Sequence, residues 1–221
     1  MTRAGSRSES MFRIKICGVT SAGDAGLAAA SGADAVGVNF YARSRRYVPP
    51  GSAAPIVRAA REGGATPVGV FVNERPEVVE AICRDLGIEV VQLSGNEPPD
   101  EAARLAFRRI KAVHVAGGLD AAALALYPCE AFLLDAGGGP DEFGGTGRPL
   151  DWARIPGASV PRAWMLAGGL TPANVGTAIR LARPGGVDVA SGVEDRPGVK
   201  DAAKVRLFIN NAKEGFNLEG L

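Results

Sequence analysis

Eight short apolar runs alternate with eight helical stretches along almost the whole 221-residue chain. The runs are rich in β-branched residues, and the stretches between them are rich in alanine with apolar residues at helical spacing. Strict alternation of this kind favours a parallel sheet whose faces are covered by helices. The predicted strands are Phe12–Ile16, Ala35–Asn39, Pro67–Val72, Glu89–Leu93, Ile110–His114, Phe132–Leu134, Ala163–Leu166 and Val187–Val189.

The helices predicted between and after these strands set the number of βα units. In Thr171-Pro172 the threonine is expected to cap a helix and the proline to occupy its first position. The predicted helices are Ser21–Ser31, Pro50–Glu62, Pro76–Leu86, Pro98–Phe107, Asp120–Leu126, Trp152–Ile155, Pro172–Ala182 and Asp201–Lys213.

Eight βα units in about 200 residues predict an α/β fold, a single-domain (β/α)8 TIM barrel. We expect the barrel to span residues 11–221 and a flexible polar extension to span residues 1–10. An open doubly wound sheet is the alternative. It is disfavoured because no G-x-G-x-x-G follows the first strand and no G-x-x-x-x-G-K-[ST] occurs anywhere.

The composition limits the binding partners and the cellular compartment that we expect for this protein. A formal net charge of +1 gives no electrostatic case for nucleic acid or a membrane surface. No apolar run reaches the ~20 residues of a membrane helix, and the N-terminus lacks the apolar core of a signal peptide. Cys17, Cys83 and Cys129 fit neither a disulfide framework nor a metal-ligand spacing. We therefore expect a cytoplasmic protein with a small-molecule partner and no metal.

In a barrel of this type, function lies at the C-terminal ends of the strands, so the end of strand one matters. Side chains alternate with period two, which predicts that Lys15 and Cys17 point into the barrel while Phe12, Ile14 and Ile16 pack on helices. A lysine beside a cysteine would favour the thiolate, a usable base. A small packing role for Cys17 is equally compatible with its position.

Strands four and six also end in polar residues. Gln92 and Ser94 are predicted to point inward, where Gln92 binds substrate or satisfies a polar layer of the barrel. Asp135 ends strand six beside two glycine-rich stretches, 137–139 and 144–147. A desolvated carboxyl group there would serve as a general acid, although an aspartate in a loop is more often a turn residue.

Small-residue loops follow strands seven and eight and contain Gly168, Gly169, Ser191 and Gly192. Such paired loops form the usual phosphate site of TIM barrels through their backbone N–H groups. The alternative, that the glycines only permit tight turns, explains the pair less well. We therefore predict a phosphate site at the C-terminal ends of strands seven and eight.

Three arginines stand in four positions after strand two, within Tyr41–Val48. Most of such a cluster is normally a solvated face, and one arginine pointing inward would suffice to bind a carboxylate bidentately. His114 is the only histidine, lies in strand five, and is expected to be structural.

Ordered strings from residue 11 to about 213 carry a family resemblance. They resemble the phosphoribosylanthranilate isomerase family, and K-I-C-G with V-D-V-x-S-G-V-E is the most specific part. The strings are K-I-C-G-V-T (15–20), G-A-D-A-V-G (32–37), F-Y-A-R-S-R-R-Y-V (40–48), V-G-V-F-V-N (68–73), V-Q-L-S-G-N-E (91–97), L-L-D-A (133–136), G-G-T-G (144–147), D-W (151–152), L-A-G-G-L-T-P-x-N-V (166–175), V-D-V-A-S-G-V-E (187–194) and P-G-V-K-D (197–201).

The resemblance implies an Amadori rearrangement of N-(5-phosphoribosyl)anthranilate in tryptophan biosynthesis, without cofactor or metal. It implies that Cys17 is the general base, Asp135 the general acid and Arg46 the ligand of the anthranilate carboxylate. The ordinary pKa of each catalytic group lies on the wrong side of neutral for its task, so we expect a lowered pKa for Cys17 and a raised pKa for Asp135. Other expected substrate contacts are Lys15, Gln92, Gly145, Gly168, Gly169, Ser191 and Gly192.

The chain also departs from the family pattern. Ser94 stands where the family commonly has histidine, and Asn39 stands where it often has a bulkier residue. These changes are expected to alter the shape of the pocket. The triple glycine at 137–139 predicts an unusually pliant loop beside Asp135.

Other functions remain as alternatives. A related isomerase of histidine biosynthesis would carry aspartate in place of Cys17, and a thiamine phosphate synthase would need an acidic magnesium site at the mouth. A barrel that binds a phosphate ligand without turnover is a non-enzyme alternative. Family members are commonly monomers, so we expect a monomer, with a homodimer as the alternative.

Overall fold

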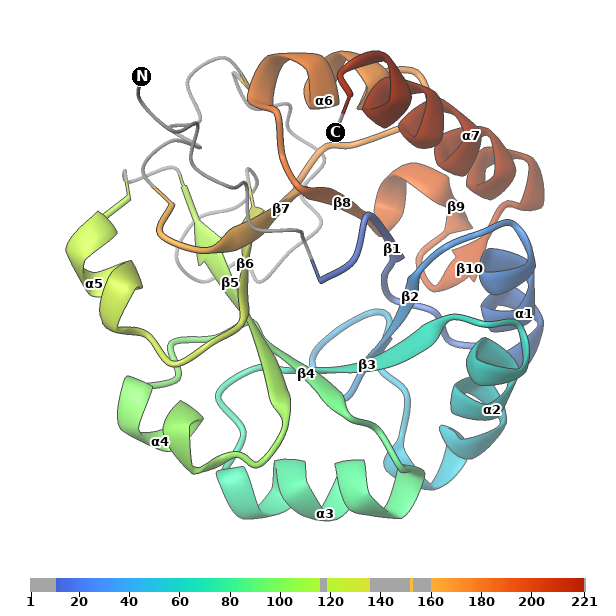
Figure 1. The fold of residues 1–221 in the computed structure, drawn as a ribbon. Helices are drawn as coiled ribbons and strands as arrows, with labels where there is room; N and C mark the ends of the chain where they lie inside the picture. Colours follow the sequence, from blue (N-terminus) through green and yellow to red (C-terminus); the bar gives the residue numbers. More distant parts are fainter. Residues whose placement is uncertain (1–10, 116–118, 136–151, 153–159, 221) are drawn as a thin grey trace.

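The strands of the molecule form a closed barrel at its centre. The computed structural model describes residues 11–115, 119–135, 152 and 160–220. Each strand pairs in parallel with the next, and β1 pairs with β8 to complete the ring (Figure 1). The predicted TIM barrel is confirmed, and the open sheet is wrong. The barrel strands are β1 (Ile14–Ile16), β2 (Ala35–Asn39), β3 (Thr66–Phe71), β4 (Val90–Leu93), β5 (Arg108–His114), β6 (Ala131–Asp135), β7 (Ala163–Ala167) and β8 (Gly186–Val189).

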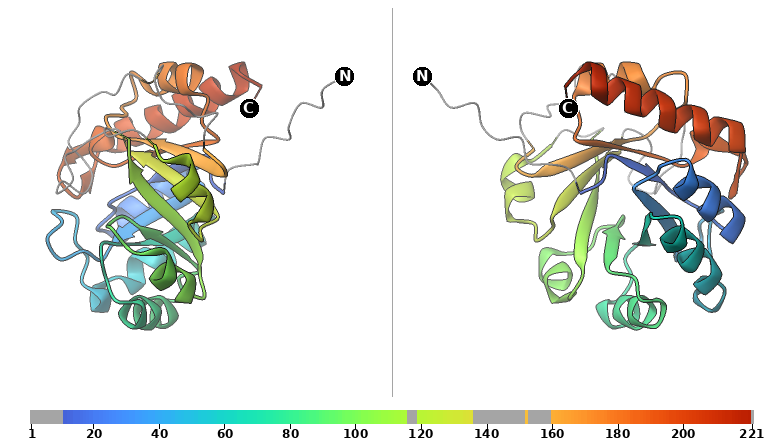
Figure 2. Two further views of the ribbon diagram at one scale, coloured as in Figure 1. Left: turned by 90° about the vertical axis from the view of Figure 1, so that its left-hand side faces the viewer. Right: turned by 45° about the vertical axis from the view of Figure 1, so that its right-hand side comes forward.

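Helices surround the barrel on its outer face (Figures 1 and 2). All eight predicted strands are present, and the helix boundaries differ from the prediction by a few residues at most ends. The predicted extension 1–10 and the predicted helix at 152–155, apart from Trp152, lie outside the described residues. The helices are α1 (Ala22–Ala30), α2 (Ala54–Glu62), α3 (Pro76–Leu86), α4 (Pro99–Arg104), α5 (Ala121–Leu126), α6 (Val175–Ala182) and α7 (Ala202–Leu218), with a 3-10 turn η1 (Pro50–Ser52) before α2.

The start of α6 corrects the predicted Thr-Pro cap. The helix begins at Val175, three residues beyond Pro172. Asn174 holds the preceding turn, since its Oδ1 accepts a hydrogen bond from Thr171 N at 2.7 Å and its Nδ2 donates to Gly169 O at 2.9 Å. The residues between β7 and α6 therefore form a shaped loop at the barrel mouth instead of a first helical turn.

Two apolar clusters follow from the alternation of side chains along the strands. The outer cluster joins strands to helices and includes Ile14 and Ile16, as predicted. The inner cluster fills the barrel and includes Val68, Ile110 and Met165. Phe12 belongs to this inner cluster, so its predicted position against the helices is wrong. The reason is that β1 starts two residues later, and period two does not extend beyond the strand.

A hairpin that the sequence did not indicate follows β8. After the 3-10 turn η4 (Ser191–Val193), strands β9 (Glu194–Arg196) and β10 (Val199–Lys200) pair in antiparallel fashion between α7 and α1 (Figure 1). Strands of two or three residues without apolar alternation give no recognisable pattern. The hairpin connects the end of β8 to α7.

Cys83 and Cys129 are packing residues, as their scattered positions suggested. Burial raises the pKa of Cys83 to about 12 and that of Cys129 to about 11. Within the described ranges, no helix has both the length and the apolar character needed to cross a membrane. The same residues contain no group of three or more His, Cys, Asp or Glu side chains placed to hold a metal ion.

Two neighbouring residues of α7 test the packing of this helix on the barrel. Phe208 is fully buried, whereas Leu207 is 52% exposed. We expect Phe208→Ala to lower the free energy of unfolding by about 3–5 kcal/mol, because it leaves a cavity in the outer cluster. Leu207→Ala, the matched control, should change it by less than about 0.5 kcal/mol. Urea denaturation followed by circular dichroism measures both, and equal losses would contradict the assignment.

Candidate active site

A pocket opens at the C-terminal mouth of the barrel. Its wall includes residues from β2, β5, β6 and β7 and from the loops that follow the strands. Two predicted residues, Lys15 and Gly192, do not line it, and predicted Gly145 lies outside the described residues. The predicted site residues that do line it are Cys17, Arg46, Gln92, Asp135, Gly168, Gly169 and Ser191.

Cys17 lies at the end of β1 above a buried ion pair. Lys15 has no exposed surface, and its Nζ donates a hydrogen bond to Asp188 Oδ1 of β8 at 2.8 Å. Lys15 also hydrogen-bonds Cys17. Gly37 of β2 leaves room for both side chains, since a Cβ there would lie 2.7 Å from Cys17 Sγ and 3.3 Å from Lys15 Nζ. Lys15 thus points inward as predicted but contacts the floor of the pocket instead of its lumen.

The groups around Cys17 have opposite effects on the pKa of its thiol. Burial raises the pKa of the thiol, Lys15 and Lys200 lower it, and Asp188 raises it further. The resulting pKa is above the ordinary value, so the predicted lowering is wrong. The sequence displayed the neighbouring lysine, but only the fold reveals the burial of the thiol and brings the carboxylate of Asp188 close to it.

Asp135 lies on the other side of the barrel, at the end of β6. It is 8% exposed, lines the pocket and is in register with His114 of β5 and Ala167 of β7. His114, expected to be structural, also lines the pocket. A thiol on β1 and a carboxyl group on β6 therefore face one cavity from separate walls. This is the arrangement required to add a proton at one atom of a small molecule and remove one at another.

Gln92 forms part of the wall between these two groups. Its Nε2 donates a hydrogen bond to Ser94 Oγ at 3.0 Å, and both residues line the pocket, as their inward direction predicted. Gln92 Oε1 is buried and has no hydrogen-bond partner among the described residues. A buried acceptor of this kind normally has a donor, which makes this oxygen a candidate contact for a ligand N–H or O–H group.

The loops after β7 and β8 lie against each other at the mouth. Gly168 and Gly169 have φ values of 85° and 66°, a conformation that favours glycine. At Gly192 a Cβ would lie 1.8 Å from Leu170 O, so no larger residue fits without separating the loops. Gly192 lies behind the lining formed by Ser191. The result is a pair of backbone loops held at a fixed distance.

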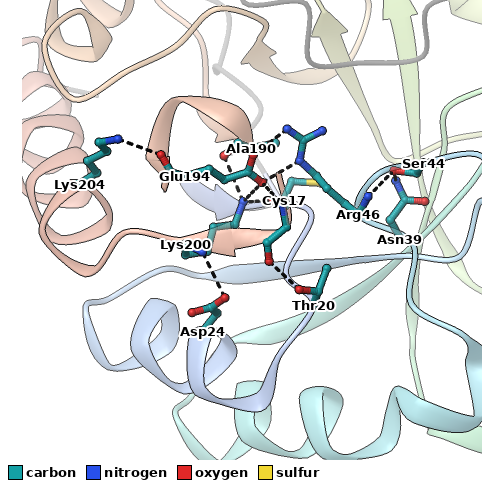
Figure 3. A network of polar contacts seen from close by, with 11 residues as sticks. Cys17, Thr20, Asp24, Asn39, Ser44, Arg46, Ala190, Glu194, Lys200 and Lys204 are labelled. Carbon is teal, nitrogen blue, oxygen red and sulfur yellow. Dashed lines mark hydrogen bonds and ion pairs between the residues drawn. The ribbon is translucent and has the colours of Figure 1, made fainter. Parts of the chain in front are cut away.

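Arg46 is the inward-pointing member of the arginine cluster. Arg43 and Arg45 are exposed, whereas Arg46 is partly buried and lines the pocket. Its Nε and Nη2 each donate a 2.7 Å hydrogen bond to the carboxylate of Glu194 (Figure 3). The guanidinium group that was predicted to bind a ligand carboxylate is thus already fixed along one edge by a carboxylate of the chain.

Sequence reasoning gave no role to Asp188, Glu194 or Lys200, although all three stand in quoted strings. A signal for Asp188 was available, because an acidic residue between two valines of a strand points into the barrel. Glu194 and Lys200 carried no such signal, since they belong to the unpredicted hairpin.

A closed parallel barrel with a thiol, a carboxyl group and paired glycine loops at its mouth defines an acid–base enzyme of the (β/α)8 class. Comparisons with known proteins identify a family within this class. The family model of N-(5'-phosphoribosyl)anthranilate (PRA) isomerase matches residues 14–211. The N-(5'-phosphoribosyl)anthranilate isomerase of Trichlorobacter lovleyi is 45% identical over 208 residues, which cover 93% of this chain and all of the relative.

Solved structures agree. Phosphoribosyl anthranilate isomerase from Thermotoga maritima superposes with a TM-score of 0.81 at 41% identity, over 92% of this chain and 100% of that chain. A phosphoribosyl anthranilate isomerase in complex with reduced 1-(o-carboxyphenylamino)-1-deoxyribulose 5-phosphate gives a TM-score of 0.78 at 40% identity, with the same coverage.

The chain belongs to the N-(5'-phosphoribosyl)anthranilate isomerase family. It is an isomerase of tryptophan biosynthesis, which converts N-(5-phosphoribosyl)anthranilate into 1-(2-carboxyphenylamino)-1-deoxyribulose 5-phosphate.

The titration of Cys17 tests the surroundings assigned to it. Because burial outweighs the nearby lysines, the thiol should ionise above its ordinary pKa of 9.0 in the protein without substrate. The measurement is the thiolate absorbance near 240 nm against pH, taken as the difference between the wild type and Cys17→Ser. The difference removes the contributions of Cys83 and Cys129. A midpoint at or below the ordinary value would contradict the assignment.

Proposed function

We propose that Asp135 and Cys17 catalyse the rearrangement as general acid and general base. Asp135 donates a proton to the furanose oxygen as the C1–O bond breaks and the anilino nitrogen forms a double bond to C1. The Cys17 thiolate then removes the proton from C2, and the released electron pair forms a C1–C2 double bond and neutralises the iminium. The product of this step is an enolamine with its hydroxyl group on C2.

Ketonisation restores both groups to their starting states. The C2 hydroxyl returns a proton to the Asp135 carboxylate, and C1 receives the proton carried by the Cys17 thiol. No atom is gained or lost, as an isomerisation requires. Each transfer by a positioned group contributes about 10²–10⁴-fold to the rate.

The observation that carries this assignment is the position of Cys17 and Asp135 on separate walls of one pocket. A raised pKa makes the Cys17 thiolate a stronger base toward a carbon acid, while it reduces the ionised fraction near neutrality. Lys15 and Lys200 limit that reduction, because their charges stabilise the thiolate. Lys15 acts in this way from below the pocket, without contacting substrate.

Three further sites match the polar groups of the substrate. Arg46 binds the anthranilate carboxylate, and the loops containing Gly168, Gly169, Ser191 and Gly192 bind the phosphate. Gln92 Oε1 accepts a hydrogen bond from a hydroxyl or N–H group of the substrate. The reduced product analogue bound by the similar solved structure carries the same carboxylate, amine and phosphate groups. A predicted contact from Gly145 completes the set.

We further propose that the enzyme works in the cytoplasm as a single barrel. The proposed acid, base and phosphate loops all belong to one barrel, so the proposed chemistry needs no residue from a second chain. The three cysteines are buried free thiols, which fits a reducing compartment.

Replacement of the two catalytic groups tests their roles. We expect Cys17→Ser and Asp135→Asn each to lower kcat by about 10²–10⁴-fold, because each loses one proton transfer. The assay follows the loss of phosphoribosylanthranilate fluorescence, with substrate made in situ and EDTA present. Asp195→Asn, at an exposed position of the hairpin, is the control and should retain wild-type turnover. A folded wild type that binds substrate without turnover would favour the non-enzyme alternative, a barrel that only binds a phosphate ligand.

The phosphate loops are tested at Gly192. We expect Gly192→Ala to raise KM by about tenfold or more, because the methyl group forces the two loops apart and about 1.4 kcal/mol of binding is lost per tenfold. Inorganic phosphate should also cease to raise the Tm. The matched control is Gly176→Ala in α6, where a Cβ meets nothing nearer than 3.8 Å. Unchanged KM and phosphate protection in Gly192→Ala would rule out this location.

A further inference from the structure

Lys200 of β10 lies buried beside the catalytic thiol without lining the pocket. Its side chain has no exposed surface. Its Nζ donates hydrogen bonds to Cys17 O at 2.7 Å, Ala190 O at 3.0 Å and Glu194 Oε1 at 3.0 Å (Figure 3). An ammonium group has three N–H donors, so all of them are used. One buried cation thus ties the end of β1, the loop after β8 and the hairpin together.

Glu194 extends this connection to Arg46. Its carboxylate is 5% exposed and accepts hydrogen bonds from both Nε and Nη2 of Arg46 as well as from Lys200. The Arg46 side chain crosses the turn after Cys17, where a Cβ at Gly18 would lie 2.2 Å from Arg46 Cδ. Glu194 holds the edge of the guanidinium group formed by Nε and Nη2. This contact also sets the direction in which Nη1 points.

We propose that Lys200 and Glu194 are positioning residues that hold the base Cys17, the phosphate loop and Arg46 in one geometry. The inference rests on the roles given above to Cys17, Arg46 and the loops. Neither Lys200 nor Glu194 lines the pocket, so neither contacts substrate. They act because the distances between base, carboxylate site and phosphate site are set by a single buried cluster of hydrogen bonds.

Stability alone does not account for this cluster. A buried ion pair loses hydration, and well-packed apolar residues often stabilise a protein equally well or better. What apolar residues cannot supply is direction, since only a charged donor bonds two main-chain carbonyls and a carboxylate at once. Directed contacts to the two elements that carry Cys17 and Ser191, and through Glu194 to Arg46, indicate preorganisation of the site.

The charge of Lys200 affects the pKa of Cys17, which a role in packing alone would leave unchanged. The charged groups facing the Cys17 thiol are Lys15 and Asp188 below it, Lys200 beside it, and Arg46 from the loop after β2. Lys200 lowers the pKa of Cys17. Removing this charge should therefore move the thiolate-dependent limb of the kcat/KM profile to higher pH.

Glu194 is tested by a double-mutant cycle with Arg46. We expect Glu194→Gln to raise KM by about tenfold with a smaller change in kcat. The reason is that the guanidinium group of Arg46 loses the carboxylate that fixes one of its edges. If Glu194 acts through Arg46, Glu194→Gln should add little to the effect of Arg46→Ala. If the effects of the two single substitutions on KM multiplied in the double variant, Glu194 would not act through Arg46 and this role would be overturned. A fall in KM for Glu194→Gln would also overturn it, because it would mean that Glu194 competes with the substrate carboxylate.

Lys200 is tested by pH–rate profiles. Lys200→Met should lower kcat/KM by about 10-fold or more and shift its ascending limb upward. Lys200→Ala leaves the space that the buried side chain filled, and added methylammonium should restore part of both in that variant. If Lys200→Met does not fold, Lys200→Gln is measured in its place. Two controls should keep the wild-type limb. Lys204→Met removes a lysine whose Nζ donates to the main-chain oxygen of Glu194 (Figure 3), and Lys111→Met breaks another buried lysine–glutamate pair, with Glu97.

The outcomes separate this inference from the proposed function. A wild type without turnover would refute the proposed function, whatever the variants do. A wild type with turnover, and a folded Lys200 variant with an unmoved limb and no amine rescue, would refute the positioning role alone.

Discussion

Closure of the barrel by β1 is the constraint on which the site depends. This strand has three residues, yet it pairs with β2 on one side and β8 on the other. Closure places the first strand beside the last, and parallel pairing brings all C-terminal strand ends to one mouth. Lys200 therefore bonds the main chain of Cys17 across 183 positions of sequence, and Lys15 meets Asp188 across the same seam.

The interior near this seam carries charge where most of the barrel is apolar. Three cations, Lys15, Arg46 and Lys200, share two anions, Asp188 and Glu194, which gives this cluster of five side chains a net charge of +1. Burial of these groups is costly, and mutual hydrogen bonds offset the cost. Fixed charges in a site that excludes water need no reorganisation during the reaction, and a net positive charge suits a substrate with a phosphate and a carboxylate.

The alternation of side chains along a strand explains much of what the sequence predicted correctly and part of what it did not. Period two along each strand correctly directed Lys15 and Gln92 into the barrel, because alternation is local to the backbone. It failed for Phe12, which precedes the strand. It also missed the hairpin, whose short strands have no apolar pattern. The sign of the Cys17 pKa shift was wrong because burial is the sum of contacts from many distant segments.

The sequence by itself determined the eight strands, the closed fold they imply, the family and the candidate acid and base. These follow from local periodicity and from residues in fixed strings. The tertiary structure alone decided which charges meet. Lys15 pairs with Asp188 instead of facing the lumen, and Glu194 with Lys200 fixes Arg46. Such pairs join residues far apart in the chain, and their energies depend on distance and desolvation, which exist only once the barrel has closed.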